Sequence, residues 1–310
     1  MAPKRLVEWH HECWAEPHEG VIAMQFQSPL SVEDAVAFLA DDQNARILSG
    51  GTDLLVRLRL GHIAPSKIVD IKKIKGMRSI TREDGGFRIG AAVSGAEMNE
   101  NHDLYLAWPG VVEAAGLIGS TQIQGRATIV GNLCNAGPAA DSVPALVAAS
   151  ATARIAGPSG VRDVLVQDIP IAPGQTSLKI GELVTSIFLP AQPVNGSDAY
   201  LRFIPRTEMD IAVVGCGVSL KLDSAGTVVQ ARVALGAVAP TVLLVENAAE
   251  ILIGTQLDDD ALSALAEVSS SVANPIDDKR GTIAFRKDVS GVLTCRAAKI
   301  AYSRAKGTVK

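Results

Sequence analysis

Hydrophobic and polar positions near the start of the chain alternate with a helical period. Apolar residues recur at helical spacing from Val32 to Leu39, and Ser31 is placed to cap this helix with Asp34 at its third position. The preceding residues, 1–23, lack any period and hold two of the three Trp and three of the five His. The pattern therefore predicts an N-terminal arm over residues 1–23 and a first helix after Ser31.

Two short apolar runs follow, and a glycine turn lies between them. Ala45–Leu48 and Lys67–Ile71 read as strands, while Thr52–Leu60 reads as a short helix that begins directly after Ser49-Gly50-Gly51. The order strand, turn, helix, strand is typical of a parallel crossover. We expect residues 24–80 to form a small subdomain of this kind.

The next segment mixes strands and helices around a long polar stretch. Residues Ser120–Asp141 are polar and rich in glycine and show no apolar period, which indicates a binding loop rather than a linker. The apolar patterns on either side predict strands at 87–93, 153–156, 161–166 and 183–189 and helices at 111–119 and 144–151. These elements form a second subdomain over residues 81–197.

The last third of the chain reads as a hairpin followed by helices. Pro190–Ser197 contains two prolines, an asparagine and a glycine and is the best domain boundary. Beyond it, strands are predicted at 212–222 and 228–238 and helices at 241–253, 259–272 and 288–306. Residues 198–310 are therefore expected to form a C-terminal antiparallel sheet-and-helix domain, which makes the fold class α+β.

Composition and charge remove several classes of function. The 310 residues carry 29 basic and 33 acidic side chains, for a net charge of -4, so nothing attracts a nucleic acid. No apolar stretch approaches the roughly 18 to 20 residues of a membrane span, and no secretory signal is evident. Cys13, Cys134, Cys216 and Cys295 lie too far apart for a disulfide framework or a metal cluster, which favours the cytoplasm.

Two loops are candidates for chemistry. In Ser49-Gly50-Gly51-Thr52-Asp53, free backbone N–H groups before a helix favour a phosphate, but the same residues suit an ordinary turn. The second loop, residues 128–133 with Asn135, Pro138 and Asp141, offers hydroxyl, amide and carboxylate groups, but it also suits a surface loop that caps the next helix. Neither is a Walker loop or a three-glycine dinucleotide motif, and Gly215-Cys216-Gly217 lies within a predicted strand, which indicates packing.

Taken together, the two loops resemble the pyrophosphate-binding pair of a known family. The matching segments are ARILSGGTDLL (45–55), IVDI (68–71), ATIVGNLCNA (127–136), PAADS (138–142), PAL (144–146), GELVT (181–185), Arg206 with DIA (210–212), DKR (278–280) and Phe285-Arg286. In this order, from about Met24 to Lys306, they are similar to the FAD-binding medium subunit of the molybdenum hydroxylases, which include xanthine dehydrogenase and aerobic carbon monoxide dehydrogenase.

The resemblance implies a two-subdomain FAD-binding fold of the PCMH type and assigns roles to individual residues. One side of the FAD pyrophosphate would be held by Ser49, Gly50, Gly51, Thr52 and Asp53, and the other by Ala127, Thr128, Gly131 and Asn132. Asp141 matches a position that reaches the ribityl or adenosine hydroxyls, Val184 an apolar position near the flavin ring, and Arg202 a position at the carbonyl edge of the ring. Arg206, Asp210, Arg280 and Arg286 read as structural charges, and no catalytic residue is expected.

The sequence departs from the family pattern at three places. Val130-Gly131 replaces a glycine pair in the second loop, Arg202 stands where the family has a Lys, and the arm precedes the usual start. Two further candidates are set aside. His10, His11, Cys13 and His18 fit no zinc spacing, and Cys134, which has no basic neighbour closer than Arg126, is expected to be a packing group.

The resemblance also implies a function within a complex. A large molybdopterin subunit would oxidise the substrate, and electrons would pass from a small [2Fe-2S] subunit through FAD to an external acceptor. The expected assembly is a dimer of heterotrimers, each with one copy of the three subunits. One alternative is a self-sufficient flavin oxidase of the vanillyl alcohol oxidase type. Another is an assembly subunit that has lost its flavin.

Overall fold

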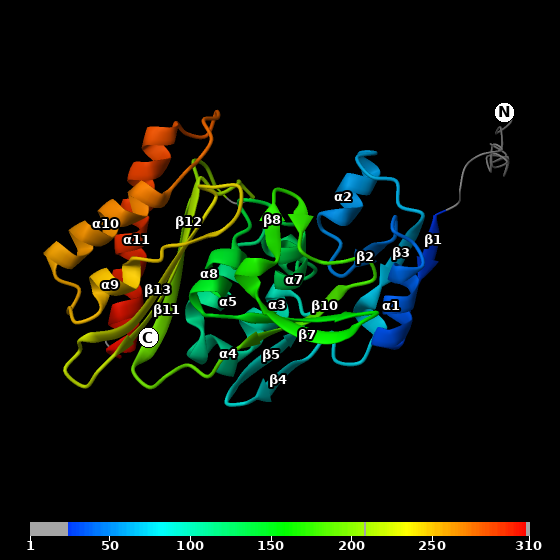
Figure 1. Ribbon diagram of the computed structural model, residues 1–310, viewed down its shortest axis with the longest axis horizontal. Helices are drawn as coiled ribbons and strands as arrows, with labels where there is room; N and C mark the ends of the chain where they lie inside the picture. Colours follow the sequence, from blue (N-terminus) through cyan, green and yellow to red (C-terminus); the bar gives the residue numbers. More distant parts are fainter. Residues whose placement is uncertain (1–23, 208, 308–310) are drawn as a thin grey trace, which may run out of the picture.

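The computed structural model describes residues 24–207 and 209–307, so the arm predicted over residues 1–23 lies outside the described residues. Three sheets follow one another along the molecule, each with its own helices (Figure 1). Each sheet forms a unit with its helices: the first unit spans residues 25–73, the second, in the middle, spans residues 80–189, and the third, which contains the C-terminal helices, spans residues 196–305. None of the described helices is both long and apolar enough to span a lipid bilayer.

The first sheet is the predicted parallel crossover with one strand added. Its order is β1 (Gln25–Gln27), β3 (Lys67–Asp70) and β2 (Arg46–Leu48), and all neighbours are parallel. Helix α1 (Val32–Ala40) begins at Ser31, whose Oγ accepts a hydrogen bond from the backbone N of Asp34 at 3.1 Å. Helix α2 (Leu54–Arg59) follows the glycine turn, which confirms the order of elements predicted here.

The second sheet is antiparallel and has the order β4-β5-β10-β6-β7. Six helices and a small two-stranded ribbon, β8-β9, accompany it. The strands are β4 (Ile80–Glu83), β5 (Gly86–Gly90), β6 (Thr152–Gly157), β7 (Gly160–Leu165), β8 (Pro170–Ala172), β9 (Gln175–Thr176) and β10 (Leu183–Leu189). The helices are α3 (Gly95–Glu100), α4 (His102–Ala107), α5 (Pro109–Gly116), α6 (Thr121–Gln124), α7 (Ile129–Cys134) and α8 (Ser142–Ala148).

The segment Ser120–Asp141, which was expected to be a binding loop, contains two short helices. Helices α6 and α7 lie within it, and α7 begins where the Thr128 side chain accepts a hydrogen bond from the backbone N of Gly131. Helices of four and six residues complete at most two turns, so they show no apolar period in the sequence. Helices α3 and α4 and strand β4 are also too short to show a clear apolar period, and the sequence analysis did not predict them.

The third sheet is antiparallel, in the order β11 (Gly196–Phe203), β12 (Val214–Leu222), β13 (Val228–Gly236) and β14 (Leu243–Leu244). Helices α9 (Ala248–Leu252), α10 (Asp259–Val272) and α11 (Ile283–Ala305) complete the unit. Two predictions are corrected: the segment 241–253 begins as strand β14, and α11 starts five residues before the predicted Asp288 because Thr282 caps it. Strand β11, unpredicted, starts inside the expected boundary segment.

The residues of β12 alternate between two different faces of the third sheet. Cys216, Val218 and Leu220 belong to the buried cluster shared with α10 and α11. On the other face, a Cβ built on Gly217 would meet the Pro144 carbonyl oxygen of α8 at 2.5 Å. Gly215-Cys216-Gly217 therefore serves packing, as predicted, because only glycine lets α8 approach the sheet this closely.

Ion pairs and hydrogen bonds of charged residues stabilise the third unit and connect it to the second unit. Asp210 accepts hydrogen bonds from Arg206, while the buried Arg286 pairs with Asp278 at 2.7 Å and donates to the Val213 carbonyl oxygen, in agreement with their reading as structural charges. Arg280 lies near both acids. Between the units, Arg304 of α11 pairs with Glu113 of α5 and donates to the Asp198 carbonyl oxygen at 3.0 Å.

Candidate functional site

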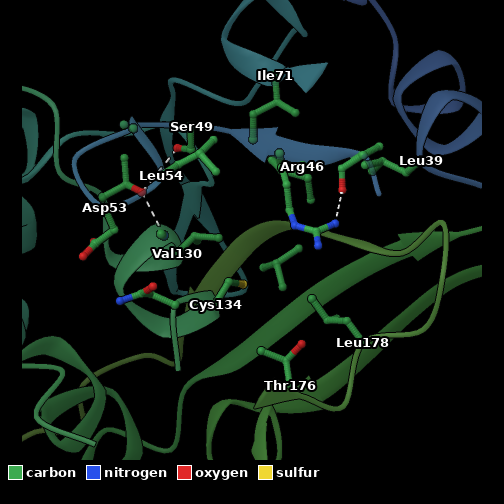
Figure 2. Close-up of a pocket in the computed structure, with 18 of the residues that line it drawn as sticks. Leu39, Arg46, Ser49, Asp53, Leu54, Ile71, Val130, Cys134, Thr176 and Leu178 are labelled. Carbon is green, nitrogen blue, oxygen red and sulfur yellow. Dashed lines mark hydrogen bonds between the residues drawn. The ribbon is translucent and has the colours of Figure 1, made fainter. Parts of the chain in front are cut away.

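A cavity of about 530 Å³ opens where the first and second units meet. This volume lies in the range of about 300 to 1,000 Å³ that is typical of ligand pockets. Figure 2 shows Arg46, Ser49 and Asp53 along one wall, contributed by β2 and the loop after it, and Thr176 and Leu178 on the opposite side. Val130 and Cys134 of α7 lie between the two walls.

The first loop presents a row of backbone donors. The N–H groups of Gly50, Gly51, Thr52 and Asp53 donate no hydrogen bond to any part of the chain that the structure describes. Gly51 has φ of +83°, and a Cβ there would also crowd the side chains of Leu48 and Leu55. Glycine is therefore required at position 51 by the backbone itself, and the resulting turn leaves several N–H groups for an external acceptor.

The second loop lies directly against the first. A Cβ built on Gly50 would stand 1.9 Å from the Arg126 carbonyl oxygen, so the two backbones touch where the glycine lies. Ser49 Oγ donates to the Ala91 carbonyl oxygen at 2.8 Å and lies 3.3 Å from Thr128 Oγ1. Thr128 Oγ1 in turn accepts from the Gly131 backbone N at 2.9 Å. Two hydroxyl groups thus connect the loops that the sequence placed far apart.

Charges along the cavity favour an anion. Arg46, Arg57 and Lys179 line it. Of the acids that also line it, Glu182 is paired with Arg162, and Asp42 accepts hydrogen bonds from Ser66 and Asn44. Burial raises the pKa of the third, Asp53, against the opposing effect of Arg57. Positive charge and free N–H groups therefore occur in the same cavity, which is what a phosphate requires.

An apolar slot adjoins this polar end. Ile118, Val130, Leu178 and Val184 line it, and Val184 is buried in β10 beside a bulge between Val184 and Ser186. Cys134 lines the slot as well, and burial raises the pKa of its thiol to about 12. The thiol is therefore protonated at neutral pH and serves packing, as expected. A flat apolar ring fits such a slot better than a charged substrate does.

The structure brings ten of the twelve predicted site residues to this cavity, as the lining shows: Ser49, Gly50, Gly51, Thr52, Asp53, Ala127, Thr128, Gly131, Asn132 and Val184. Asn132 also ties α7 to α8, because its Oδ1 accepts hydrogen bonds from the backbone N and Oγ of Ser142. Asp141 and Arg202 are not among the lining residues. They form a buried ion pair of 2.9 Å, and Tyr200 donates to Asp141 at 3.2 Å.

Several residues of the site carry no signal in the sequence. Lys72 stands behind the first loop, where its Nζ donates to the Ser49 carbonyl oxygen at 3.1 Å and to Asp70 Oδ1 at 2.7 Å. Gly174, Thr176 and the residues 178–180 also line the cavity, and none of them belongs to a motif of the sequence. Among the described residues, no group of three or more His, Cys, Asp or Glu is arranged to hold a metal.

Comparisons with known proteins cover nearly the whole described chain. Residues 22–192 match the family described as the FAD-binding domain in molybdopterin dehydrogenase, and residues 198–301 match the carbon monoxide dehydrogenase flavoprotein C-terminal domain. The putative xanthine dehydrogenase FAD-binding subunit XdhB of Escherichia coli is 31% identical over 282 residues, which are 90% of this chain and 96% of that protein.

Two further proteins are similar to this chain over about the same share of its length. The carbon monoxide dehydrogenase medium chain of Afipia carboxidovorans is 31% identical over 285 residues, 92% of this chain and 98% of that one. A chain in the solved structure of reconstituted CO dehydrogenase from Oligotropha carboxidovorans superposes with a TM-score of 0.87 at 30% identity, and the match covers 91% of this chain and 98% of that chain. The similarity therefore extends through all three units.

Proposed function

This chain belongs to the family of FAD-binding medium subunits of the molybdenum hydroxylases, and from that premise we propose that its 530 Å³ cavity holds the FAD. The chain would act as the electron-transfer subunit of its complex, between an iron-sulfur subunit and an external acceptor. When bound, FAD supplies the capacity to take up and release electrons one or two at a time. The residues of this chain bind and orient it.

The observation that carries the proposal is the contact between the two loops. The backbones meet at Gly50 and Arg126, and the free N–H groups of residues 50–53 are present where they meet. A pyrophosphate bound there would receive hydrogen bonds from the first loop while Thr128 and Gly131 approach it from the second. The apolar slot at Val184 and Leu178 suits a ring system.

Asp141 and Arg202 would contribute differently from the pyrophosphate loops. Their ion pair joins β11 to the residue that precedes α8, and Arg202 Nη1 also donates to the Leu117 carbonyl oxygen at 2.9 Å. Contact of Asp141 with a cofactor hydroxyl and of Arg202 with the ring remains part of the proposal, on the strength of the family resemblance. Because Leu117 precedes Ile118, which lines the cavity, the hydrogen bond of Arg202 also links this part of the wall to the C-terminal sheet.

The partners form the second part of the proposal. Relatives are medium chains of multi-subunit dehydrogenases, and the description of the matched family names molybdopterin. We propose a small [2Fe-2S] subunit and a large molybdopterin subunit as partners, assembled as a dimer of heterotrimers in the cytoplasm. The wide spacing of the four cysteines along the sequence supports this compartment, because it offers no disulfide framework.

Purification of the chain from its native host tests this assignment. A tag on the chain should recover two further chains, one with iron and sulfide and one with molybdenum, together with one FAD per tagged chain. The isolated chain, loaded with FAD, should not oxidise substrates with an artificial electron acceptor. Substrate turnover by the isolated chain would instead support the self-sufficient oxidase, and recovery of a complex without flavin would support the assembly subunit.

A further inference from the structure

Helix α2 carries apolar side chains all around its axis, yet none of its residues is buried. The seven residues from Leu54 to Leu60 are four leucines, one valine and two arginines. No residue of α2 belongs to either of the two buried apolar clusters of the described chain. A helix that is apolar all round is normally buried. Within residues 24–207 and 209–307, nothing supplies the surface that would bury this one.

The helix has an inner face and an outer face. Leu54 and Arg57, three residues apart, line the FAD cavity and form the inner face. Val56, Arg59 and Leu60 are also three and four residues apart, but none of them lines the cavity, and we call them the outer face. A hydrogen bond of 3.0 Å from Leu60 N to the Val56 carbonyl oxygen extends the helical turn to Leu60. Val56 is 53% exposed and Leu60 is 62% exposed.

The outer face also carries a positive charge without a partner. Arg59 lies in the last turn of α2 and forms no hydrogen bond, ion pair or ring contact with any part of the chain that the structure describes. From Leu54 to Val69 the sequence contains no Asp or Glu. Arginine is enriched at protein interfaces, where its planar guanidinium binds carboxylates in bidentate pairs. The outer face therefore complements a protein surface that combines apolar side chains with carboxylates.

Two other occupants match this face less well. In a two-fold dimer the same patch meets itself, so a second copy of the chain would bring one Arg59 close to the other. A lipid surface binds amphipathic helices in proportion to the apolar area that they bury. Helix α2 has only six residues and turns Leu54 toward the cavity, which leaves little apolar area for a membrane. A different protein is the better partner.

The position of α2 selects among the partner subunits. The helix begins directly after the loop Ser49–Asp53 and contributes to the wall of the FAD cavity. Figure 1 shows it at the outer edge of the first unit. If FAD occupies this cavity, the subunit that donates electrons to it must lie close by. A subunit that covers the outer face of α2 meets this requirement.

We propose that the outer face of α2 docks the iron-sulfur subunit, through an apolar surface of that subunit that carries carboxylates. This inference rests on the function proposed above. Val56 and Leu60 supply the apolar contact, and Arg59 pairs with a carboxylate of the partner.

Replacement of the chain in its native host by tagged variants tests this surface, with the iron and sulfide recovered per tagged chain as the readout. Leu60→Glu puts a carboxylate opposite the carboxylates of the partner and should lower the recovered iron at least about tenfold. Arg59→Glu should act in the same direction for the same reason. Arg59→Lys keeps the positive charge and should lose less iron than Arg59→Glu.

Leu106→Glu is the matched control, because Leu106 is 66% exposed on α4, at the opposite edge of the molecule in Figure 1. It should recover as much iron as the unmodified chain. The isolated Leu60→Glu chain should bind FAD with unchanged affinity, because Leu60 does not line the cavity. That titration shows that the first loop is intact in the variant.

Equal iron with Leu60→Glu and Leu106→Glu overturns the docking surface, while FAD and partners recovered with the unmodified chain leave the proposed function intact. Loss of molybdenum with iron retained overturns it in favour of the large subunit. A mass of the isolated chain that Leu60→Glu halves does so in favour of a second copy. Binding to phosphatidylserine vesicles that Leu60→Glu abolishes does so in favour of a lipid surface. An unmodified chain that recovers neither FAD nor iron overturns the proposed function as well.

Discussion

Arg202 Nη1 donates to Asp141 Oδ2 at 2.9 Å, and this pair joins strand β11 of the third unit to the residue that precedes α8. The side chains of both residues are almost entirely buried. Arg202 also donates to the Leu117 carbonyl oxygen, at the end of α5. One guanidinium therefore holds two helices of the FAD-binding unit to the C-terminal sheet.

Loss of this guanidinium should destabilise the whole chain. Arg202→Gln leaves the buried carboxylate of Asp141 without its cation, which typically lowers the free energy of unfolding by about 3 to 5 kcal/mol. Arg206→Gln is the control, since the Arg206 side chain is largely exposed and Asp210 keeps Arg280 nearby, so the loss of this pair should cost only about 0 to 1 kcal/mol. Urea denaturation of both variants measures the difference. Equal stabilities would show that the Arg202 pair is not a structural link.

The contact between the two loops leads to a prediction about flavin retention. Gly50→Ala places a Cβ 1.9 Å from the Arg126 carbonyl oxygen, so the loops must separate and the FAD affinity should fall at least about tenfold. Gly125→Ala, at the end of α6 and just before the second loop, is the matched control, because a Cβ there meets nothing within 4 Å and the backbone is helical. Fluorescence titration with FAD gives both affinities. A Gly50→Ala chain that retains full affinity would contradict the site.

Lys72 supports the first loop from behind and should affect flavin binding without touching the cavity. Its Nζ holds the Ser49 carbonyl oxygen, which directs the following N–H groups away from Lys72. Lys72→Met should weaken FAD binding about tenfold, because the loop loses a charge-assisted hydrogen bond. Lys73→Met removes the same charge from an exposed neighbour and should bind as before. If both variants weaken binding equally, only the net charge matters.

Asp198 gives the chain an unusual dependence of stability on pH. Its carboxylate accepts hydrogen bonds from the backbone N of Gly110 and Val111 at the start of α5, but burial raises its pKa to about 7. Between pH 4 and pH 7 the folded chain thus keeps a proton that the unfolded chain releases. The contribution of Asp198 to the free energy of unfolding is therefore present below pH 4 and is lost as the pH rises to 7.

The size of this effect follows from the two pKa values. The difference from the ordinary value of about 3.9 corresponds to about 4 kcal/mol. Asp198→Asn should remove it, so the stability difference between the unmodified chain and the variant should fall as the pH rises from 4 to 7. Burial also raises the pKa of Asp141, to about 6, but that group is present in both chains. A difference that does not change with pH would contradict the prediction.

The sequence predicts those parts of the site whose geometry is local. The strand before Ser49, the turn at Gly50-Gly51 and the helix after Asp53 depend on neighbouring residues, and the structure contains all three. The family resemblance indicated that the second loop lies beside the first, and Gly50 now gives the physical reason, since no side chain separates it from Arg126. Periodicity alone places neither loop near the other.

What the sequence misses depends on contacts between distant residues. Lys72 carries no motif, and its role arises only because η1 (Ile71–Lys73) brings it behind Ser49. The partner of Arg202 is Asp141, 61 residues earlier, and no local pattern indicates that pair. Helices α6 and α7 are too short to show an apolar period, and their positions follow from caps such as Thr128.

The cofactor content of the purified chain tests the central claim most directly. The full chain, expressed with flavin available and freed of unbound cofactor, should show the visible absorption bands of an oxidised flavin. Denaturation should then release one FAD per chain, and the Gly50→Ala chain should release much less than the Gly125→Ala chain. A folded, colourless chain that does not bind added FAD would contradict the account, as would a flavin retained equally by both variants.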